Sequence, residues 1–348
     1  MSKNTIIPIF VPHIGCPNAC VFCNQKIITG KDDAEVNRNY VISIVEQYMK
    51  TRNKYTELAF FGGSFTAIDL KLQTELLEIA YFYKKKGYFD KIHMSTRPDA
   101  INEDILELQK KYSVDVIELG IQSLDEKVLK ASNRGHTVAD SINASKLIKS
   151  HGFILGHQVM PGLPASTYES DMMTCKKSIE LEPDIVRIYP TLTIKQTKLA
   201  EMLENEEYRP LNLEEALNLS TKIYANYRRA GINVIRIGLQ NTDTINDDED
   251  VVGGPFHPAF RSLVEDRIYY DSIKQNLDKN NIRNVNEIEI AANSKCFNNI
   301  YGLKKANIIK LQEEFKIDKI KVSKMNIENG YELINDGQSI KITDKDLY

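Results

Sequence analysis

The stretch Cys16-Pro17-Asn18-Ala19-Cys20-Val21-Phe22-Cys23 places three cysteines on one short loop, directly after an apolar run that begins at Ile6. A protein-only iron–sulfur cube needs four thiolates, and a structural zinc site also needs four ligands. Three thiolates on one loop can instead hold three irons of a [4Fe–4S] cube and leave the fourth iron open to a ligand, as a catalytic zinc leaves one position open. The stretch therefore predicts a cluster bound by Cys16, Cys20 and Cys23. Phe22 stands where an aromatic ring can shield the cluster from water.

This spacing, with an aromatic residue before the last cysteine, resembles the signature of the radical S-adenosylmethionine (SAM) superfamily. The resemblance implies that the amino and carboxylate groups of SAM chelate the open iron. It also implies that one electron from the cluster cleaves SAM to methionine and a 5′-deoxyadenosyl radical. The alternatives are a zinc knuckle, a redox thiol set and unrelated cysteines. The remaining two cysteines, Cys175 and Cys296, are expected to be inert buried thiols.

The bulk composition is that of a globular protein: 348 residues, 42% hydrophobic and 27% charged, with a net charge of −3. The length suits one large domain, or a large and a small one. No apolar run reaches the ~18–20 residues of a membrane span, and the first residues lack the apolar core of a signal peptide. An odd number of cysteines does not make a disulfide framework, and an oxygen-sensitive cluster needs a reducing compartment, so we expect a cytoplasmic protein without membrane partners.

Apolar runs alternate with amphipathic stretches over the first two-thirds of the chain. This order predicts parallel strands joined by helical crossovers, in six β/α steps. A doubly wound open sheet is the alternative. We expect a partial (β/α)6 TIM-like barrel, because the polar candidates follow the strands at their carboxyl ends, and radical SAM proteins have such a barrel. The predicted strands of these steps are 6–14, 58–61, 92–95, 116–121, 153–160 and 185–189, and a further apolar strand is expected at 234–237.

The predicted domain division is a radical SAM core over 1–240, a linker and helix over 241–281, and a small C-terminal α/β module over 282–348. Residues 197–211 are expected to form a polar insertion. Asn212 is expected to open a long helix, with Glu215 as its capping-box partner. The acidic stretch 242–250 is expected to be a mobile loop.

Seven residues are candidates for holding SAM. Gly62 and Gly63 close the second strand, where glycines let the backbone approach a ligand. The resemblance implies that this segment contacts the SAM amino group. An arginine can pair bidentately with the SAM carboxylate, and a glutamine can bond its ribose or methionine part. The structural alternatives are that the arginines form surface salt bridges and that Gln122 caps the end of a strand. His157, in the fifth strand, is equally well explained as a packed core histidine. The candidates are Gly62, Gly63, Ser64, Arg97, Glu118, Gln122 and Arg134.

Four further segments resemble the radical SAM domain of the catalytic subunit of Elongator, over roughly residues 5–270, and more distantly oxygen-independent coproporphyrinogen oxidase. That Elongator subunit modifies carbon 5 of the wobble uridine of tRNA and carries an acetyltransferase domain. The sequence ends about 80 residues after the likeness fades, so we expect no acetyltransferase domain. The spacing of its cysteines is also tighter than in Elongator. The resemblance therefore does not imply that this chain transfers an acetyl group. The segments are 120–123, 134–137, 160–164 and 187–192.

The last part of the chain predicts a β-α-loop-α-β order that resembles the KH RNA-binding core. The GXXG loop of a KH domain clamps a nucleic-acid backbone. Here the loop reads Gly302-Leu303-Lys304-Lys305, so a lysine replaces the second glycine. The replacement weakens close backbone approach but adds charge. Lys304 and Lys305 are the RNA-binding candidates, and a plain packing module is the alternative.

Three functions remain open at this point. The first is a radical SAM enzyme that modifies RNA, most plausibly tRNA, with a ferredoxin or flavodoxin as electron donor. The second is a radical SAM enzyme acting on a small molecule such as a tetrapyrrole. The third is an RNA-binding factor with a structural cluster. Reductive cleavage of SAM separates the first two from the third, and co-purifying nucleic acid separates the first from the second.

Overall fold

The computed structural model divides into two compact units, Met1–Ala216 with Ile232–Phe256, and Leu217–Gly231 with His257–Tyr348. The segment 241–281, predicted from the sequence as one linker and helix, is divided between the units at residue 256. The structure describes residues 5–11, 16, 20–24, 36–51, 55–239, 250–327, 330–343 and 346–348. Most of the predicted acidic loop, and the predicted end of the first strand, lie outside these residues.

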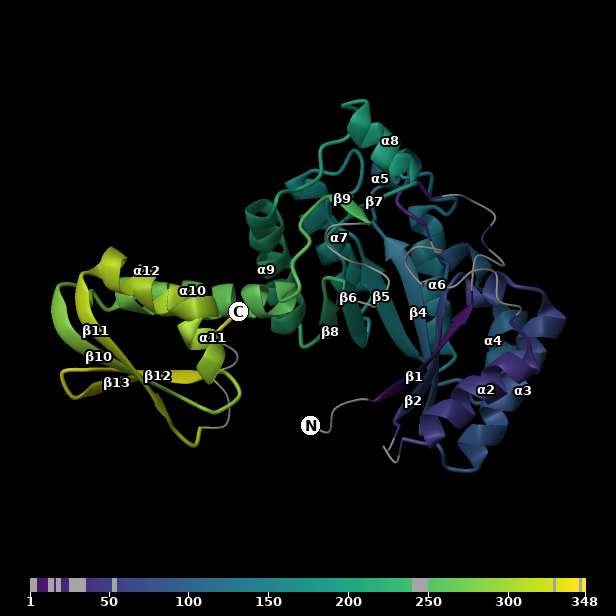
Figure 1. Ribbon diagram of the computed structural model, residues 1–348, viewed down its shortest axis with the longest axis horizontal. Coiled ribbons are helices and arrows are strands. Elements are labelled where there is room, and N and C mark those ends of the chain that lie inside the picture. The colour runs from purple at the N-terminus through teal and green to yellow at the C-terminus, as the bar shows by residue number, and fades with distance from the viewer. Residues whose placement is uncertain are drawn as a thin grey trace. The chain divides into compact units, whose positions relative to one another are not determined.

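The first unit is built on a seven-stranded sheet whose strands follow one another in chain order (Figure 1). Every neighbouring pair is parallel. The expected curled, barrel-like α/β fold is confirmed, and β8 adds a seventh strand to the six expected β/α steps. The strands are β1 (Ile6–Val11), β2 (Glu57–Gly62), β3 (Lys91–Thr96), β4 (Val116–Gln122), β5 (Ile154–Val159), β6 (Ile185–Ile188) and β8 (Asn233–Ile237).

Helices return the chain between successive strands, and capping side chains set where they begin. The Asn102 side chain accepts a hydrogen bond from Ile105 N, and Thr137 forms a capping box with Asp140. Asn212 and Glu215 form the predicted reciprocal pair, at 2.9 Å in both directions. None of the helices in the described ranges has an apolar stretch long enough to cross a lipid bilayer. The crossover helices are α2 (Arg38–Met49), α3 (Leu70–Lys85), α4 (Glu103–Lys111), α6 (Val138–Ser150), α7 (Tyr168–Glu180) and α9 (Leu213–Arg229).

The predicted polar insertion has its own structure. It holds helix α8 (Lys198–Glu204), preceded by the short strand β7 (Thr193–Ile194), which pairs antiparallel with β9 (Val251–Gly253). A second short helix, α5 (Glu126–Ala131), was also missed from the sequence. Both helices are too short for a clear hydrophobic period, which explains why the pattern did not reveal them.

The second unit is a helix-covered sheet in the order β11-β10-β12-β13, and it has the predicted β-α-loop-α-β order. Strands β10 and β11 are parallel, whereas β12 pairs antiparallel with both β10 and β13. Residues Ile288, Ile290, Leu311 and Phe315 form its core and are at most 1% exposed. Besides most of α9, the elements of this unit are α10 (Phe260–Lys279), β10 (Val285–Ala292), α11 (Phe297–Tyr301), η3 (Leu303–Lys305), α12 (Ala306–Phe315), β11 (Ile317–Lys324), β12 (Tyr331–Asn335) and β13 (Gln338–Ile342).

Candidate cluster and cofactor site

The end of β2 lies against the start of the cysteine loop. Gly62 has a φ of +105°, and a Cβ added there would lie 2.6 Å from Val11 O, so only glycine fits. Gly63 N donates a hydrogen bond to the same carbonyl at 2.6 Å. The backbone amide of Ser64 hydrogen-bonds the Cys16 thiol, which favours the thiolate. The two glycines thus bring a backbone donor to the first cysteine.

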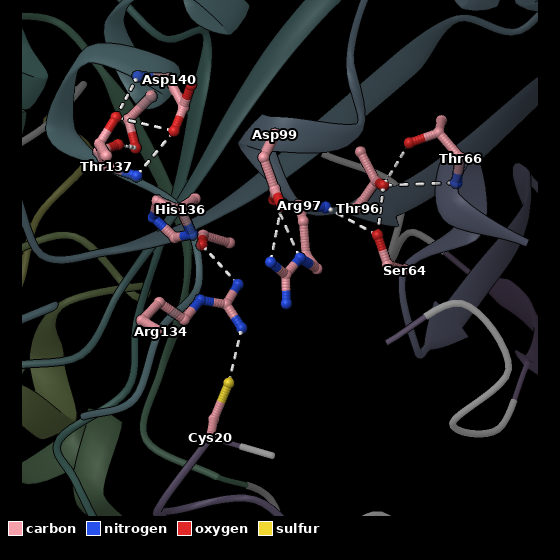
Figure 2. Close-up of polar contacts among 12 residues, drawn as sticks. Cys20, Ser64, Thr66, Thr96, Arg97, Asp99, Arg134, His136, Thr137 and Asp140 are labelled. Carbon is pink, nitrogen blue, oxygen red and sulfur yellow. Dashed lines mark hydrogen bonds and ion pairs between the residues drawn. The ribbon is translucent and has the colours of Figure 1, made fainter. Parts of the chain in front are cut away.

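A buried set of hydroxyl groups ties this turn to the end of β3 (Figure 2). Thr96 Oγ1 lies 2.9 Å from Ser64 Oγ and 2.6 Å from Thr66 Oγ1. Ser64 Oγ also accepts a hydrogen bond from Arg97 N at 3.1 Å. The sequence interpretation included Ser64 and Arg97 but missed Thr96, whose role depends on the pairing of two strands.

Arg97 is held in one orientation by Asp99. Its Nε and Nη2 donate to the two carboxylate oxygens at 2.9 and 2.7 Å. Burial opposes the charge of Arg97, but this pairing outweighs it and raises the pKa of the guanidinium. The buried Nη1 has no hydrogen-bond partner within the described residues. The side chain therefore keeps one donor for a ligand.

Arg134 extends toward the same region as Arg97 and lies beside Cys20 (Figure 2). Its Nη2 donates to Gly120 O at 2.8 Å, and its Nη1 lies 3.3 Å from Cys20 Sγ. A Cβ at Gly120 would come within 2.9 Å of Arg134 Nη2 and 2.8 Å of Gln122 Nε2. Gly120 therefore leaves room for both side chains. Gln122 ends β4 in a left-handed conformation, with φ +61°, an uncommon state for a residue with a side chain.

His136 lies behind Arg134. Burial and the neighbouring Arg134 charge lower the pKa of His136 to about 4, so the ring is neutral at neutral pH. Nε2 lies 3.2 Å from Ile121 O, which puts the proton on that nitrogen. The buried Nδ1 has no partner among the residues that the structure describes.

The three thiols influence one another electrostatically. Burial, together with Cys20 and Cys16, raises the pKa of Cys23 to about 12. Burial also raises the pKa of Cys16, while Arg97 and Arg134 lower it. No three Cys, His, Asp or Glu side chains in the described segments lie close enough to hold one metal ion. A cube binds each cysteine at a different iron, so its ligands lie further apart than the ligands of a single ion.

The end of helix α5 and the start of helix α8 hold the cysteine loop through long-range contacts. Val21 N donates to Ser132 O at 3.1 Å, and Leu199 N donates to Val21 O at 2.7 Å. Val21, Leu199 and Tyr208 form a buried apolar cluster against which Phe22 packs. The aromatic residue before the last cysteine thus anchors the loop on the insertion.

Glu118 lies in a buried polar network of the sheet. Arg187 Nε lies 2.8 Å from its carboxylate, His93 Nε2 lies 3.2 Å from it, and Gln158 Nε2 donates to it. Both oxygens are engaged, so a direct contact of Glu118 with SAM stays a prediction. His157 is a satisfied core histidine, because its nitrogens lie 2.9 and 2.8 Å from two serine hydroxyls.

The residues at this edge of the sheet fit a polar, charged ligand. Buried polar atoms of four side chains have no hydrogen-bond partner among the described residues. Such atoms are costly unless a ligand or water satisfies them. Two of the four belong to arginines that flank the cysteine loop, which suits a carboxylate. The atoms are Arg97 Nη1, Gln122 Oε1, Arg134 Nε and His136 Nδ1.

A buried carboxyl group holds the loop after β5 and was missed from the sequence. Asp171 accepts a hydrogen bond from Gly162 N at 3.0 Å, and Tyr208 OH donates to Gly162 O at 2.7 Å. Burial raises the pKa of Asp171 to about 7, although the Gly162 amide opposes the shift. An ordinary amphipathic helix gives no signal for such a residue, since an acidic first turn is common in helices.

We expect Asp171→Asn to stabilise the protein at neutral pH. Asp171 has its pKa raised from 3.8 to about 7, so the unfolded chain loses its proton first and stability falls as pH rises between those values. Asparagine keeps the acceptor for Gly162 N without ionising. The gain should be up to ~4 kcal/mol at pH 8 and near zero below pH ~4. Urea denaturation at several pH values measures it, and an equal effect at all pH values would contradict this assignment.

The two RNA-binding candidates lie in the second unit. Lys304 and Lys305 are exposed, with φ values of +53° and +65°. Leu303 N donates to the buried Asp266 carboxylate at 3.0 Å, which fixes the loop. A Cβ at Gly302 would lie 2.8 Å from the Asn307 side chain, so glycine is required there.

Comparison with protein families gives two adjoining matches. Residues 10–176 match the Radical SAM superfamily, and residues 183–270 match the Radical_SAM C-terminal domain. The chain is 38% identical over 262 residues to a tRNA uridine(34) acetyltransferase of Methanocaldococcus jannaschii, covering 63% of this chain and 48% of that protein. It is 33% identical over 137 residues to Elongator complex protein 3 of Saccharomyces cerevisiae, covering 38% of this chain and 25% of that protein.

Among solved structures, archaeal Elp3 of Methanocaldococcus infernus with an N-terminal deletion matches with a TM-score of 0.60 at 23% identity. The match covers 86% of this chain and 67% of that one, and it supports the fold. The chain spans about half the length of the archaeal uridine acetyltransferases that it matches.

Proposed function

Because this chain belongs to the radical SAM superfamily, we propose that it is an enzyme that cleaves SAM reductively at a [4Fe–4S] cluster and modifies a base of tRNA. The observation that carries the proposal is the convergence of Cys16, Cys20 and Cys23 with Arg97 and Arg134 at the carboxyl ends of parallel strands. This edge is the functional face of β/α barrels.

Cys16, Cys20 and Cys23 would hold the cluster, which when bound supplies the electron that cleaves SAM to methionine and a 5′-deoxyadenosyl radical. The protein's own task is to favour three thiolates in a buried place. At Cys16 the Ser64 amide, Arg97 and Arg134 lower the pKa against the effect of burial, and Arg134 Nη1 lies 3.3 Å from Cys20 Sγ. The apolar packing of Phe22 on α8 excludes water from one side of the loop.

SAM would be held by the groups that lack partners. Arg97 and Arg134 offer donors for its carboxylate, and the backbone of Gly62, Gly63 and Ser64 faces its amino group. Gln122 would bond its ribose or methionine part. We propose that Glu118 acts from behind these residues, by fixing the side chains of Arg187 and His93.

The tRNA substrate rests on the relatives, whose names describe tRNA uridine(34) acetyltransferases. A ferredoxin or flavodoxin would supply the electron, in a reducing compartment such as the cytoplasm. Mass spectrometry of nucleosides from cells with and without the gene tests this function. A tRNA nucleoside that disappears without the gene supports it. SAM cleavage with unchanged nucleosides would favour a small-molecule substrate. Absence of SAM cleavage would favour an RNA-binding factor whose cluster is structural.

Replacing Arg134 with glutamine should weaken SAM binding by ~1.5–3 kcal/mol, the usual worth of a charge-assisted hydrogen bond. Equilibrium dialysis with the reconstituted protein measures the affinity. Arg134 also contacts Cys20, so iron content must be measured in parallel. Arg97→Gln is the matched variant. Unchanged affinity in Arg134→Gln, with a loss in Arg97→Gln, would assign the carboxylate to Arg97.

We propose that the loop with Lys304 and Lys305 contributes to RNA binding, because both side chains are exposed on a fixed turn. The double change Lys304→Glu with Lys305→Glu should weaken tRNA binding and flatten its salt dependence by up to about two phosphate equivalents. SAM cleavage without substrate should not change. Filter binding at two salt concentrations measures both effects. Equal tRNA affinity of the double variant and the wild type would show that this loop does not contact the RNA.

A further inference from the structure

A surface at the carboxyl-terminal ends of α3 and α4 combines exposed lysines with one exposed ring, Phe82, beside the half-buried Tyr81 and the buried Tyr112. We call it the basic–aromatic patch and define it by Tyr81, Phe82, Lys85, Lys86, Lys111 and Tyr112. It lies wholly in the first unit. None of its residues belongs to the site described above.

One ring contact joins the end of α4 to α3, and three lysines lie over rings of the patch. Tyr81 and Tyr112 meet edge to face at 6.2 Å, with Lys85 Nζ 5.2 Å above the first ring and Lys111 Nζ 5.1 Å above the second. Lys86 Nζ lies 4.2 Å above the Phe82 ring. Phe82 itself is 46% exposed. Each ammonium group is thus placed beside an aromatic face.

The patch carries positive charge that neighbouring carboxylates do not cancel. Lys85, Lys86 and Lys111 of the patch, and Lys110 next to it in the chain, are exposed and form no ion pair with any carboxylate in the described segments. Two acids lie nearby, and each has a cation of its own: Asp115 pairs with Lys84 at 2.5 Å, and Glu78, which accepts a hydrogen bond from Tyr112 OH at 3.1 Å, lies 3.9 Å from Arg38. Lysines elsewhere on this unit do pair, as Lys149 does with Glu182. The charge is therefore local, on a chain whose net charge is −3.

Helix electrostatics explains only part of this arrangement. Lysines near a helix C-terminus interact favourably with its dipole, so basic ends are ordinary. The dipole does not explain an exposed Phe82 under an ammonium group, nor Tyr88, which is 36% exposed and contacts the same Tyr83 ring as Phe82 does. Exposed rings next to lysines suit nucleic acid, because the lysines contact phosphates and a ring can stack on a base. Protein interfaces instead favour arginine over lysine, and the patch has no arginine.

We propose that the basic–aromatic patch is a second RNA contact of this protein, separate from its catalytic edge; this inference rests on the RNA substrate of the proposed function. The crossover helices run antiparallel to the strands, so the ends of α3 and α4 lie at the end of the barrel opposite the cysteine loop. Helix α3 alone spans about 24 Å. A ligand that reaches both places must be an extended polymer, which tRNA is and a tetrapyrrole is not.

The test compares tRNA binding by the reconstituted full chain and by neutralised variants. Lys85→Gln with Lys86→Gln, and Lys110→Gln with Lys111→Gln, should each weaken binding about fivefold or more at low salt. Each pair should lower the slope of log affinity against log salt by about one to two units. Phe82→Ala should weaken binding about fivefold or more with the slope unchanged, because stacking is not ionic. Lys146→Gln with Lys176→Gln is the control, because it removes two exposed lysines from other helices.

The outcomes separate this inference from the function itself. Substrate-free SAM cleavage with dithionite should be the same in all variants, and thermal unfolding checks that each is folded. Equal tRNA binding by the wild type and both pairs, or an equal loss in the control, would overturn the patch while leaving the function intact. No tRNA binding by the wild type would overturn both. The variants could also bind tRNA normally and lose SAM cleavage only when reduced flavodoxin replaces dithionite. That result would make the patch a docking site for a protein instead.

Discussion

Alanine at Cys16, Cys20 or Cys23 is expected to abolish the iron–sulfur cluster and all reductive cleavage of SAM. The wild type should bind about four irons per chain after anaerobic reconstitution, the content of one cube. In the proposed assignment each of these cysteines is one of only three protein ligands, so no other thiolate of the loop can replace it. Iron and sulfide analysis and the formation of 5′-deoxyadenosine measure the two losses.

The other two cysteines are the matched controls. Cys175 is 1% exposed and Cys296 is 6% exposed, and Cys296 Sγ lies 3.3 Å from Gly330 O. Cys175→Ala and Cys296→Ala should therefore keep the cluster and the SAM cleavage. Loss of iron in either control, or a full complement of iron in Cys20→Ala, would mean that the cluster is bound differently.

Removing the positive charge of Arg187 should destabilise the protein strongly. Burial raises the pKa of the fully buried Glu118, but Arg187 and His93 overcome this and lower it to about 2. Arg187→Met would leave that carboxylate without its main partner. Breaking a buried ion pair from one side costs ~3–5 kcal/mol, which urea denaturation at pH 7 would detect.

The double variant Arg187→Met with Glu118→Gln separates the charge from the packing. It removes the unpaired charge, so it should recover most of the lost stability. The difference in stability between the single variant and the wild type should shrink as pH falls. The unpaired carboxylate of the variant stops destabilising near pH 4.5, where the unfolded chain takes up its proton, and the wild type loses the stabilisation from Glu118 as pH falls further toward its folded pKa of about 2. A double variant as unstable as the single one would show that the guanidinium matters for packing on Phe61, which lies 5.3 Å away.

Local signals were sufficient for much of the fold. The alternation of apolar runs and amphipathic stretches predicted the first six parallel strands, because a strand buried on both faces shows as a continuous apolar run. Capping pairs such as Asn212 and Glu215 were read correctly, since both partners lie within one helical turn. The cysteine spacing and the Gly62-Gly63 pair marked the candidate site for the same reason, because each is a short-range pattern.

What the sequence determined by itself is therefore the β/α order and the location of the cysteine loop and its glycine turn. The tertiary structure decided which distant residues complete the site. Leu199 holds Val21 through the backbone, and Glu118 turns out to pair with Arg187, 69 residues away. These contacts form only when strands and insertions are brought together in space. No local pattern encodes them, because side chains far apart in the chain become neighbours only through the pairing and packing of whole elements.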